Sequence, residues 1–354
     1  MINKKLGERT FAFLSPPSVL ASACVGGKKE GEGPLRGEFD ILNEDSFFGM
    51  ETWEKAESEM QRLALSEALK KADMASPDFV FAGDLLNQCV GSAFGLRGSG
   101  IPFFGVYGAC STMAESLILA SMAVDGGFAS NAAAMTSSHF CGAERQFRFP
   151  LEYGGQRTPT AQWTVTGAGA VIVGESAAPP YITRFTSGRI VDAGIRDANN
   201  MGAAMAPAAY DTLSAHFNDT GRAPDYYDLI VTGDLGALGS ELLRELFSDG
   251  GGPRLGKNYT DCGLLIYSRG NADKPNRFAA GKTAESGDQD VQAGGSGCGC
   301  GASVLAGYIL RAMKKGRLER VLFAATGAMM SSLSAQQGES IPSICYAVSI
   351  ENHA

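Results

Sequence analysis

Residues 105–124 read GVYGACSTMAESLILASMAV, an apolar helical stretch that opens with a cysteine. The apolar residues 102–106 predict a short strand, and Gly105 and Gly108 predict a tight turn between that strand and the helix. Cys110 would therefore lie at the positive end of a helix, where free backbone N–H groups favour a thiolate and hence a nucleophile. The alternative is that Cys110 is a small core residue at this turn, since it is one of eight cysteines.

The rest of the chain alternates between strand-like and helix-like stretches. Strands are predicted at 78–83, 102–106, 131–137, 167–173, 227–232, 320–325 and 343–350, and helices at 53–72, 111–124, 240–247 and 302–314. The layout of the first half returns in the second, which predicts an α/β fold of two similar halves, residues 1–175 and 176–354. The length of 354 residues fits two halves, because single cores rarely grow beyond about 250–300 residues.

Three motifs carry a resemblance to a known superfamily. They are the Cys110-Ser111-Thr112 turn, the strand at 228–231, and the glycine-rich run 294–302 before a helix. In this order they resemble the thiolase and ketoacyl synthase superfamily over nearly the whole chain. The resemblance implies a thiolase-like fold of two pseudo-duplicated βαβαβ halves in a five-layer αβαβα arrangement. It also implies a homodimer, formed along the strand that precedes the Cys110 helix.

Within this superfamily the chain is similar to a non-condensing family of proteins from spore-forming bacteria. The similarity runs from Gly7-Glu8-Arg9-Thr10 through residues 110–115 to the glycine-cysteine run near the C-terminus. It implies binding of dipicolinic acid (pyridine-2,6-dicarboxylic acid), free or as its calcium chelate, for uptake during sporulation and release in germination. It further implies a peripheral position on the forespore and spore inner membrane, beside integral membrane proteins of the same operon.

Two positions depart from the condensing enzymes of the superfamily. The resemblance implies a His after the second-half strand and an Asn or His at the glycine-rich turn, but residues 232–236 and 297–299 contain neither. Because each general acid or oxyanion donor contributes about 10²–10⁴-fold in rate, we predict no catalytic residues and no enzyme. Two alternatives are an active ketoacyl synthase or acyltransferase that pairs Cys110 with His139, and a scaffolding subunit that binds nothing small.

The candidate ligand-binding residues follow from the same motifs, and they are Cys110, Ser111, His139, Arg145, Gly297, Cys298 and Gly299. His139 ends a predicted strand, and ligands of open α/β sheets bind at such ends. Glycines before a helix let the backbone approach an anion, and Arg145 or Arg148 would supply positive charge. We expect Cys110, His139 and Cys298 to line one cavity. The alternatives are a core histidine bonded to backbone, and glycines needed only for close helix packing.

Charge and composition exclude several classes of protein. A net charge of -8, with no basic run beyond the pairs at 28–29 and 314–315, argues against a nucleic-acid partner. Cys298 and Cys300 lack a CxxC partner pair, which predicts free thiols rather than a metal site, and no cofactor is expected. No apolar window approaches the roughly 18 residues of a membrane span, and the polar start at residues 1–9 predicts no signal peptide.

Overall fold

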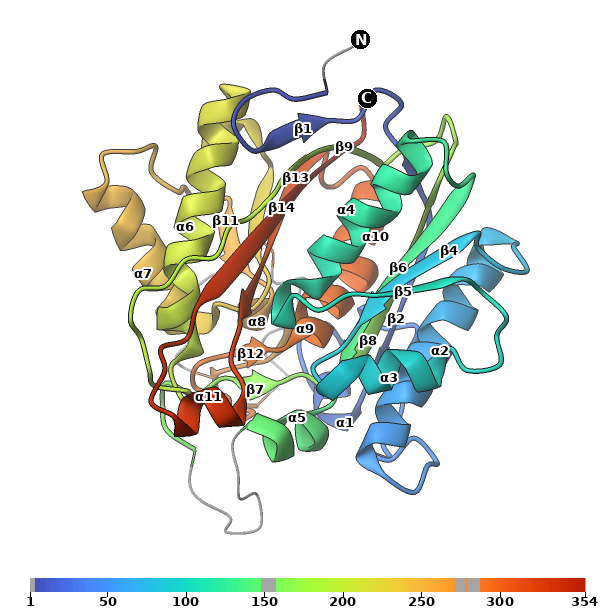
Figure 1. Ribbon diagram of the computed structural model, residues 1–354, viewed down its shortest axis with the longest axis horizontal. Helices are drawn as coiled ribbons and strands as arrows, with labels where there is room; N and C mark the ends of the chain where they lie inside the picture. The colour runs from blue at the N-terminus through green and yellow to red at the C-terminus, as the bar shows by residue number, and fades with distance from the viewer. Residues whose placement is uncertain (1–3, 148–156, 271–277, 279–286, 354) are drawn as a thin grey trace.

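The computed structural model describes residues 4–147, 157–270, 278 and 287–353 (Figure 1). Its strands form one long twisted path, which divides into an N-terminal and a C-terminal sheet of the same internal order. The first half contains β1 (Thr10–Ala12), β2 (Ser18–Gly26), α1 (Lys28–Gly31), η1 (Arg36–Glu38), β3 (Ile41–Leu42), α2 (Trp53–Ala72), β4 (Phe79–Gly83), η2 (Asn87–Cys89), α3 (Val90–Gly95), β5 (Phe103–Gly105), η3 (Ala109–Ser111), α4 (Thr112–Asp125), β6 (Asn131–Ser138), α5 (Phe140–Phe147), β7 (Trp163–Thr164) and β8 (Gly167–Gly174).

The second half repeats this layout after a short connection. It contains β9 (Tyr181–Thr186), α6 (Met201–Thr220), η5 (Pro224–Tyr226), β10 (Leu229–Thr232), α7 (Gly236–Asp249), β11 (Tyr259–Asp261), α8 (Gly263–Ile266), β12 (Gly295–Ser296), α9 (Cys298–Ser303), a π-helical turn (Val304–Ile309), α10 (Leu310–Lys314), β13 (Arg320–Ala328), α11 (Ser332–Gln336) and β14 (Ser343–Glu351).

Strand order demonstrates the duplication directly. The N-terminal sheet runs β2-β8-β6-β4-β5 and the C-terminal sheet runs β9-β14-β13-β10-β11. In both sheets the last three strands are parallel and the first two pairings are antiparallel. The sheets meet through one bridge, between Ser18 of β2 and Tyr181 of β9.

Five layers result from how the helices cover these sheets (Figure 1). Helix α2 lies on the outer face of the N-terminal sheet, and α6 and α7 lie on the outer face of the C-terminal sheet, each over its own apolar core. Helix α4 and the continuous helix α9–α10 fill the space between the sheets, in a core to which strands of both halves contribute. The thiolase-like α/β fold is therefore confirmed, with the α4 and α9 N-termini in the central layer.

Most predicted elements are confirmed, with shifted ends. Helix α2 spans the predicted residues because Thr52 caps its first turn and Asp73, at φ 53°, ends it. The helix predicted at 302–314 begins four residues earlier, at Cys298, and the one predicted at 240–247 begins at Gly236. The sequence reasoning gave no residue range for β2, β9, β11 or α6. The transition between halves falls between β8 and β9, and the division at residues 175 and 176 stays a prediction.

Within the described residues, none of the helices has the length and apolar character needed to cross a membrane.

Candidate functional site

Cys110 lies in a tightly bonded turn between β5 and α4. Ala109 before it has a φ of +49°, a left-handed conformation that non-glycine residues rarely adopt. The turn is held by its own hydroxyls: Ser111 Oγ donates to Gly108 O at 2.6 Å, and Thr112 Oγ1 donates to Ala109 O at 2.6 Å. The predicted strand–turn–helix is therefore present, and the turn presents the Cys110 side chain to a cavity while Ser111 is used within the turn.

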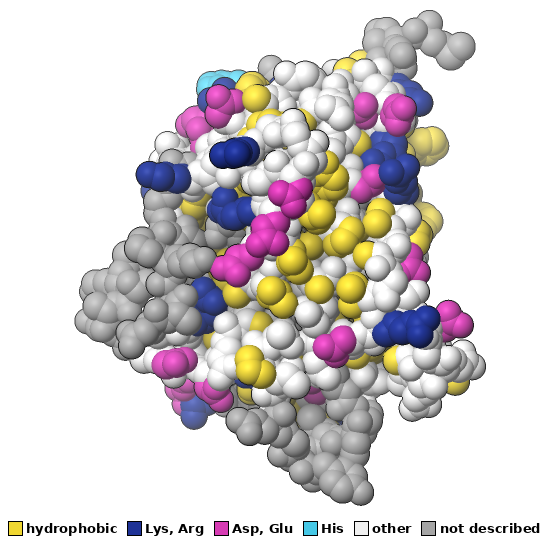
Figure 2. Space-filling view, turned by 90° about the vertical axis from the view of Figure 1, so that its left-hand side faces the viewer, with side chains coloured by type: hydrophobic (Ala, Val, Ile, Leu, Met, Phe, Trp, Pro, Cys, Tyr) yellow, Lys and Arg dark blue, Asp and Glu magenta, His cyan; other side chains and the backbone are white. Residues whose placement is uncertain are grey.

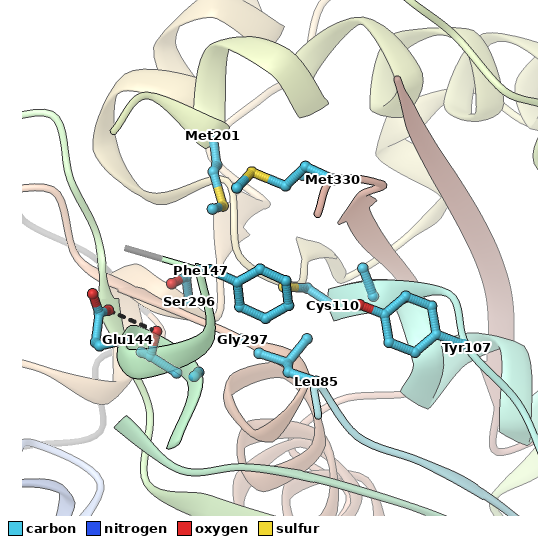
Figure 3. Close-up of a pocket in the computed structure, with 13 residues that line it drawn as sticks. Leu85, Tyr107, Cys110, Glu144, Phe147, Met201, Ser296, Gly297 and Met330 are labelled. Carbon is cyan, nitrogen blue, oxygen red and sulfur yellow. Dashed lines mark hydrogen bonds between the residues drawn. The ribbon is translucent and has the colours of Figure 1, made fainter. Parts of the chain in front are cut away.

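The cavity at Cys110 is narrow and mostly apolar (Figure 3). It holds about 430 Å³ of empty space, counting its mouth, and is lined by Leu85, Tyr107, Ala109, Cys110, Ala143, Glu144, Phe147, Thr164, Met201, Ser296, Gly297, Ala328 and Met330. In Figure 3 the rings of Phe147 and Tyr107 lie near Cys110, with Met201 and Met330 above them. Glu144 is the charged member among these described residues, and Thr164 Oγ1 donates a hydrogen bond to it at 3.1 Å.

A buried carboxylate acts on the Cys110 thiol through its charge. Asp234 follows β10 and is 1% exposed. It accepts hydrogen bonds from Thr326 Oγ1 at 2.8 Å and from the Gly297 N–H at 3.4 Å. Burial raises the pKa of Asp234 to about 6. Burial, followed by the charge of Asp234, raises the pKa of Cys110 well above its ordinary value, so Cys110 is a protonated thiol rather than a thiolate.

A second buried acid fixes the loop that carries Asp234. Asp261, at the end of β11, accepts hydrogen bonds from Thr232 Oγ1 at 2.6 Å and from the N–H groups of Leu235 and Gly236 at 2.9 Å. Burial nevertheless raises the pKa of Asp261 to about 7. The sequence reasoning missed both acids, because it examined residues 232–236 only for a histidine. The available signal was an aspartate directly after a buried strand, at the sheet edge that also carries the cysteine turn.

The glycine-rich turn reaches the cavity through Ser296 and Gly297, and the φ of Gly297 is +93°. A Cβ on Gly297 would lie 2.7 Å from Ser138 Oγ, which explains the glycine by close packing. Cys298 Sγ donates to Ser137 O at 2.8 Å, and the Gly299 N–H donates to Ser138 Oγ at 3.1 Å. These two residues therefore face strand β6 rather than the cavity.

His139 and Arg145 point to other surroundings. His139 is buried, its Nε2 lies 2.8 Å from Ser46 O, and burial lowers its pKa, so the ring is neutral. Arg145 forms an ion pair with Glu54, and its guanidinium lies 5.0 Å from the Trp53 ring centroid. It lines a separate surface hollow on the other side of α5.

The structure thus brings Cys110 and Gly297 into one cavity and leaves Ser111, His139, Arg145, Cys298 and Gly299 outside its lining. The expectation that Cys110, His139 and Cys298 line one cavity is not met. Cys298 packs against lining residues, Cys110 among them, but its thiol bonds to Ser137 O and it is not part of the lining. His139 turns toward Ser46. Arg148 lies outside the described residues. Among the residues that the structure does describe, no group of three or more His, Cys, Asp or Glu could hold a metal ion.

The family assignment comes from comparison with known proteins. The model of the family "Stage V sporulation protein AD" matches residues 7–351. Stage V sporulation protein AD of Bacillus subtilis (strain 168) is 43% identical over 350 residues, which cover 98% of each chain. The chain belongs to the stage V sporulation protein AD family.

Solved structures relate this family member to condensing enzymes by fold alone. Human mitochondrial 3-ketoacyl-CoA thiolase in complex with CoA is 12% identical with a TM-score of 0.57, covering 97% of this chain and 99% of the thiolase. 3-Oxoacyl-[acyl-carrier-protein] synthase III from Aquifex aeolicus VF5 is 14% identical with a TM-score of 0.55, covering 95% and 99%. Cerulenin-bound OleA of Xanthomonas campestris is 14% identical with a TM-score of 0.55, covering 96% and 97%. This stage V sporulation protein AD family member therefore has the enzyme fold, and its chemistry must be argued from its own residues.

Proposed function

We propose that this sporulation protein is a non-catalytic binding protein for dipicolinic acid, which it holds for uptake during sporulation and release in germination. The observation that carries the proposal is that Cys110 is buried at the cavity wall, where burial and the charge of Asp234 raise the pKa of its thiol. A nucleophilic cysteine needs a neighbouring base or cation that favours its thiolate. Asp234 does the opposite, because its negative charge raises the pKa of the thiol.

The cavity suits a small flat ring. The aromatic rings of Tyr107 and Phe147 and the thioethers of Met201 and Met330 offer apolar surface to a pyridine ring (Figure 3). Cys110 then forms part of the floor, where its role is shape rather than reactivity.

The charge of the cavity favours the calcium chelate over the free dianion. The described lining contains the carboxylate of Glu144 and no Lys, Arg or His, so a bare dicarboxylate would meet like charge. In the chelate, the two carboxylates of the ligand balance the charge of the metal, and Ca²⁺ accepts further oxygen ligands. Glu144, at the cavity wall, would supply one of these further ligands to the calcium that enters with the dipicolinate.

Assembly and location follow as further parts of the proposal. Strand β5 forms the free edge of the described N-terminal sheet, with Phe104 half exposed and stacked on Phe81 at 5.0 Å. Such an edge supports a homodimer that continues the sheet across a two-fold axis. We further propose a peripheral position on the forespore and spore inner membrane, through integral membrane proteins of the same operon.

Calorimetric titration with dipicolinate, with and without equimolar calcium, tests the proposal. We expect binding that is at least tenfold tighter with calcium, and Glu144→Gln should reduce this advantage while leaving any binding of the free acid unchanged. Cys110→Phe should abolish binding by filling the floor, whereas Cys110→Ser should be milder. Equal loss for Ser and Phe would show that the thiol itself matters.

A catalytic role is the competing outcome. Intact-mass analysis after incubation with acetyl-, malonyl- or medium-chain acyl-CoA should show no added acyl group. An acyl mass that disappears in Cys110→Ala would replace the binding proposal with the enzyme.

A further inference from the structure

Helices α6 and α7 form a parallel pair on the outer face of the C-terminal sheet. A Cβ on Gly239 of α7 would lie 2.9 Å from the Cα of Gly202 on α6, so the two backbones touch near their first turns. Eight residues further along each helix, the rings of Tyr210 and Phe247 meet at 4.9 Å. Because both contacts keep the same offset, the helices run side by side in the same direction.

The outer surface of this pair is apolar. Along α6 the half-buried residues Ala203, Pro207 and Tyr210 follow one another at helical spacing, and along α7 so do Leu238, Leu242 and Leu246. We call these six residues the α6–α7 face. Figure 2 shows apolar side chains gathered on this side of the molecule. Two parallel helices with facing apolar rows leave a groove of the kind that a third helix fills.

A row of acids borders the face on its α7 side. Glu241, Glu245 and Asp249 are exposed, and each lies three residues after one of the leucines, hence beside it on the helix surface. Figure 2 shows acidic side chains in a line along one border of the apolar region. Arg244, the basic residue of α7, is occupied by the carbonyl oxygens of Leu255 and Tyr259, each at 3.0 Å.

We propose that the α6–α7 face docks a helix of a partner protein, apolar along one stripe and carrying Lys or Arg beside that stripe. The apolar rows would bury the stripe, and the acidic row would pair with the basic side chains and set the helix direction. Helix α7, with 14 residues, offers a groove of about 21 Å. An anionic membrane surface would be repelled by the acidic row, and a second copy of the chain would bring the same acids rather than basic groups.

None of the six residues of the α6–α7 face lines the Cys110 cavity, although Met201 at the start of α6 does. Failure of this proposal is therefore distinguishable from failure of ligand binding. The probe is a synthetic helical peptide of about 18 residues, long enough to span α7, with leucines at helical spacing and lysines elsewhere. Its twin replaces every lysine with glutamate. Both are titrated against the full chain by fluorescence anisotropy at low and high salt.

The lysine peptide should bind at least tenfold more tightly than the glutamate twin, and less tightly at high salt. The double reversal Glu245→Lys with Asp249→Lys should weaken it by about tenfold, because two attractions become repulsions. The matched control reverses two exposed acids elsewhere, Glu44→Lys with Glu339→Lys, and should leave binding unchanged. Leu242→Gln, checked for folding by circular dichroism, should also weaken binding.

Four results would overturn the proposal. One is equal affinity for the two peptides, and another is equal weakening by the reversal and by its control. The third is self-association of the wild-type chain in sedimentation that is lost in Leu242→Gln or in the double reversal. This result would mean that a second copy of the chain covers the α6–α7 face. Binding of the wild-type chain to vesicles of anionic lipid that the reversal strengthens would likewise exclude a protein helix as the natural partner.

Discussion

Replacing Asp234 by asparagine should change how the stability of the fold depends on pH. In the folded chain burial raises the pKa of Asp234 from 3.8 to about 6, so the folded state binds this proton more tightly than the unfolded chain does. The resulting stabilisation is fully present below about pH 4 and is lost as the pH rises through about 6. At about 1.4 kcal/mol for each pH unit, the loss is about 3 kcal/mol.

Asparagine carries no charge whose burial costs free energy, so the stability of the variant does not depend on pH at this position. Its amide has one oxygen where the carboxylate has two, so either Thr326 Oγ1 or the Gly297 N–H loses its acceptor, which costs about 1–2 kcal/mol at every pH. We therefore expect Asp234→Asn to be less stable than the wild type at pH 4 and to gain about 3 kcal/mol relative to it by pH 7. Removing the Asp234 charge also eases ionisation of Asp261, which acts in the same direction.

Urea unfolding of the wild type and of Asp234→Asn at intervals from pH 4 to pH 8 measures this difference. Groups that titrate in the same way in both proteins cancel when the two free energies of unfolding are subtracted. The exposed Asp249→Asn serves as the control, because its carboxylate is solvated in both states. A difference between Asp234→Asn and wild type that stays constant with pH would refute the argument. It would mean that the Asp234 carboxylate is well solvated in the fold and does not oppose ionisation of Cys110.

Three further predictions test other parts of the structure. Cys110 should react with iodoacetamide far more slowly than a free thiol at pH 8, because burial and Asp234 raise its pKa, and Asp234→Asn should speed the reaction; peptide mass mapping measures both rates. Phe104→Glu should convert the proposed dimer to monomer in sedimentation velocity at micromolar concentration. The control Phe94→Glu, at another exposed phenylalanine, should leave the dimer intact. Gly297→Ala should destabilise the fold by about 2–4 kcal/mol in urea unfolding, since its φ is +93° and its Cβ would meet Ser138 Oγ at 2.7 Å; Gly98→Ala, also at positive φ but in open space, should cost less.

The sequence predicts the layers of this fold well because buried strands and the helices between them have strong local patterns. Residues 131–138 and 167–174 are continuous runs of small and apolar residues, as expected of strands covered on both faces. The strand β9 was not predicted because its residues Tyr181–Thr186 mix apolar and polar side chains. Which of these side chains become buried depends on the strands and helices that pack against β9, and local sequence does not specify those neighbours.

The direction of a side chain was harder to predict than its element. Helix α5 points Ala143, Glu144 and Phe147 into the Cys110 cavity, and it points Arg145 toward Glu54 on α2. Adjacent residues of a helix differ by about 100° in direction, so the one-residue step from Glu144 to Arg145 reverses the charge that the cavity receives. Which face of α5 meets the cavity depends on packing against α2 and β7, and local sequence does not carry that information.

The duplication explains why an aspartate acts on the cysteine. Gly83-Asp84-Leu85 follows β4 and Gly233-Asp234-Leu235 follows β10, and these two strands occupy equivalent places in the two sheets. Asp84 is used within its own half, where the Leu86 N–H donates to it at 3.0 Å and Ser92 donates from N–H and hydroxyl at 2.7 and 2.6 Å. The charge of Asp234 instead acts on Cys110 of the other half and raises the pKa of its thiol. The same turn thus closes a loop in one half and holds a thiol protonated in the other. Asp84→Asn should therefore loosen the 84–92 loop in hydrogen exchange without altering the reactivity of Cys110, whereas Asp234→Asn should alter that reactivity.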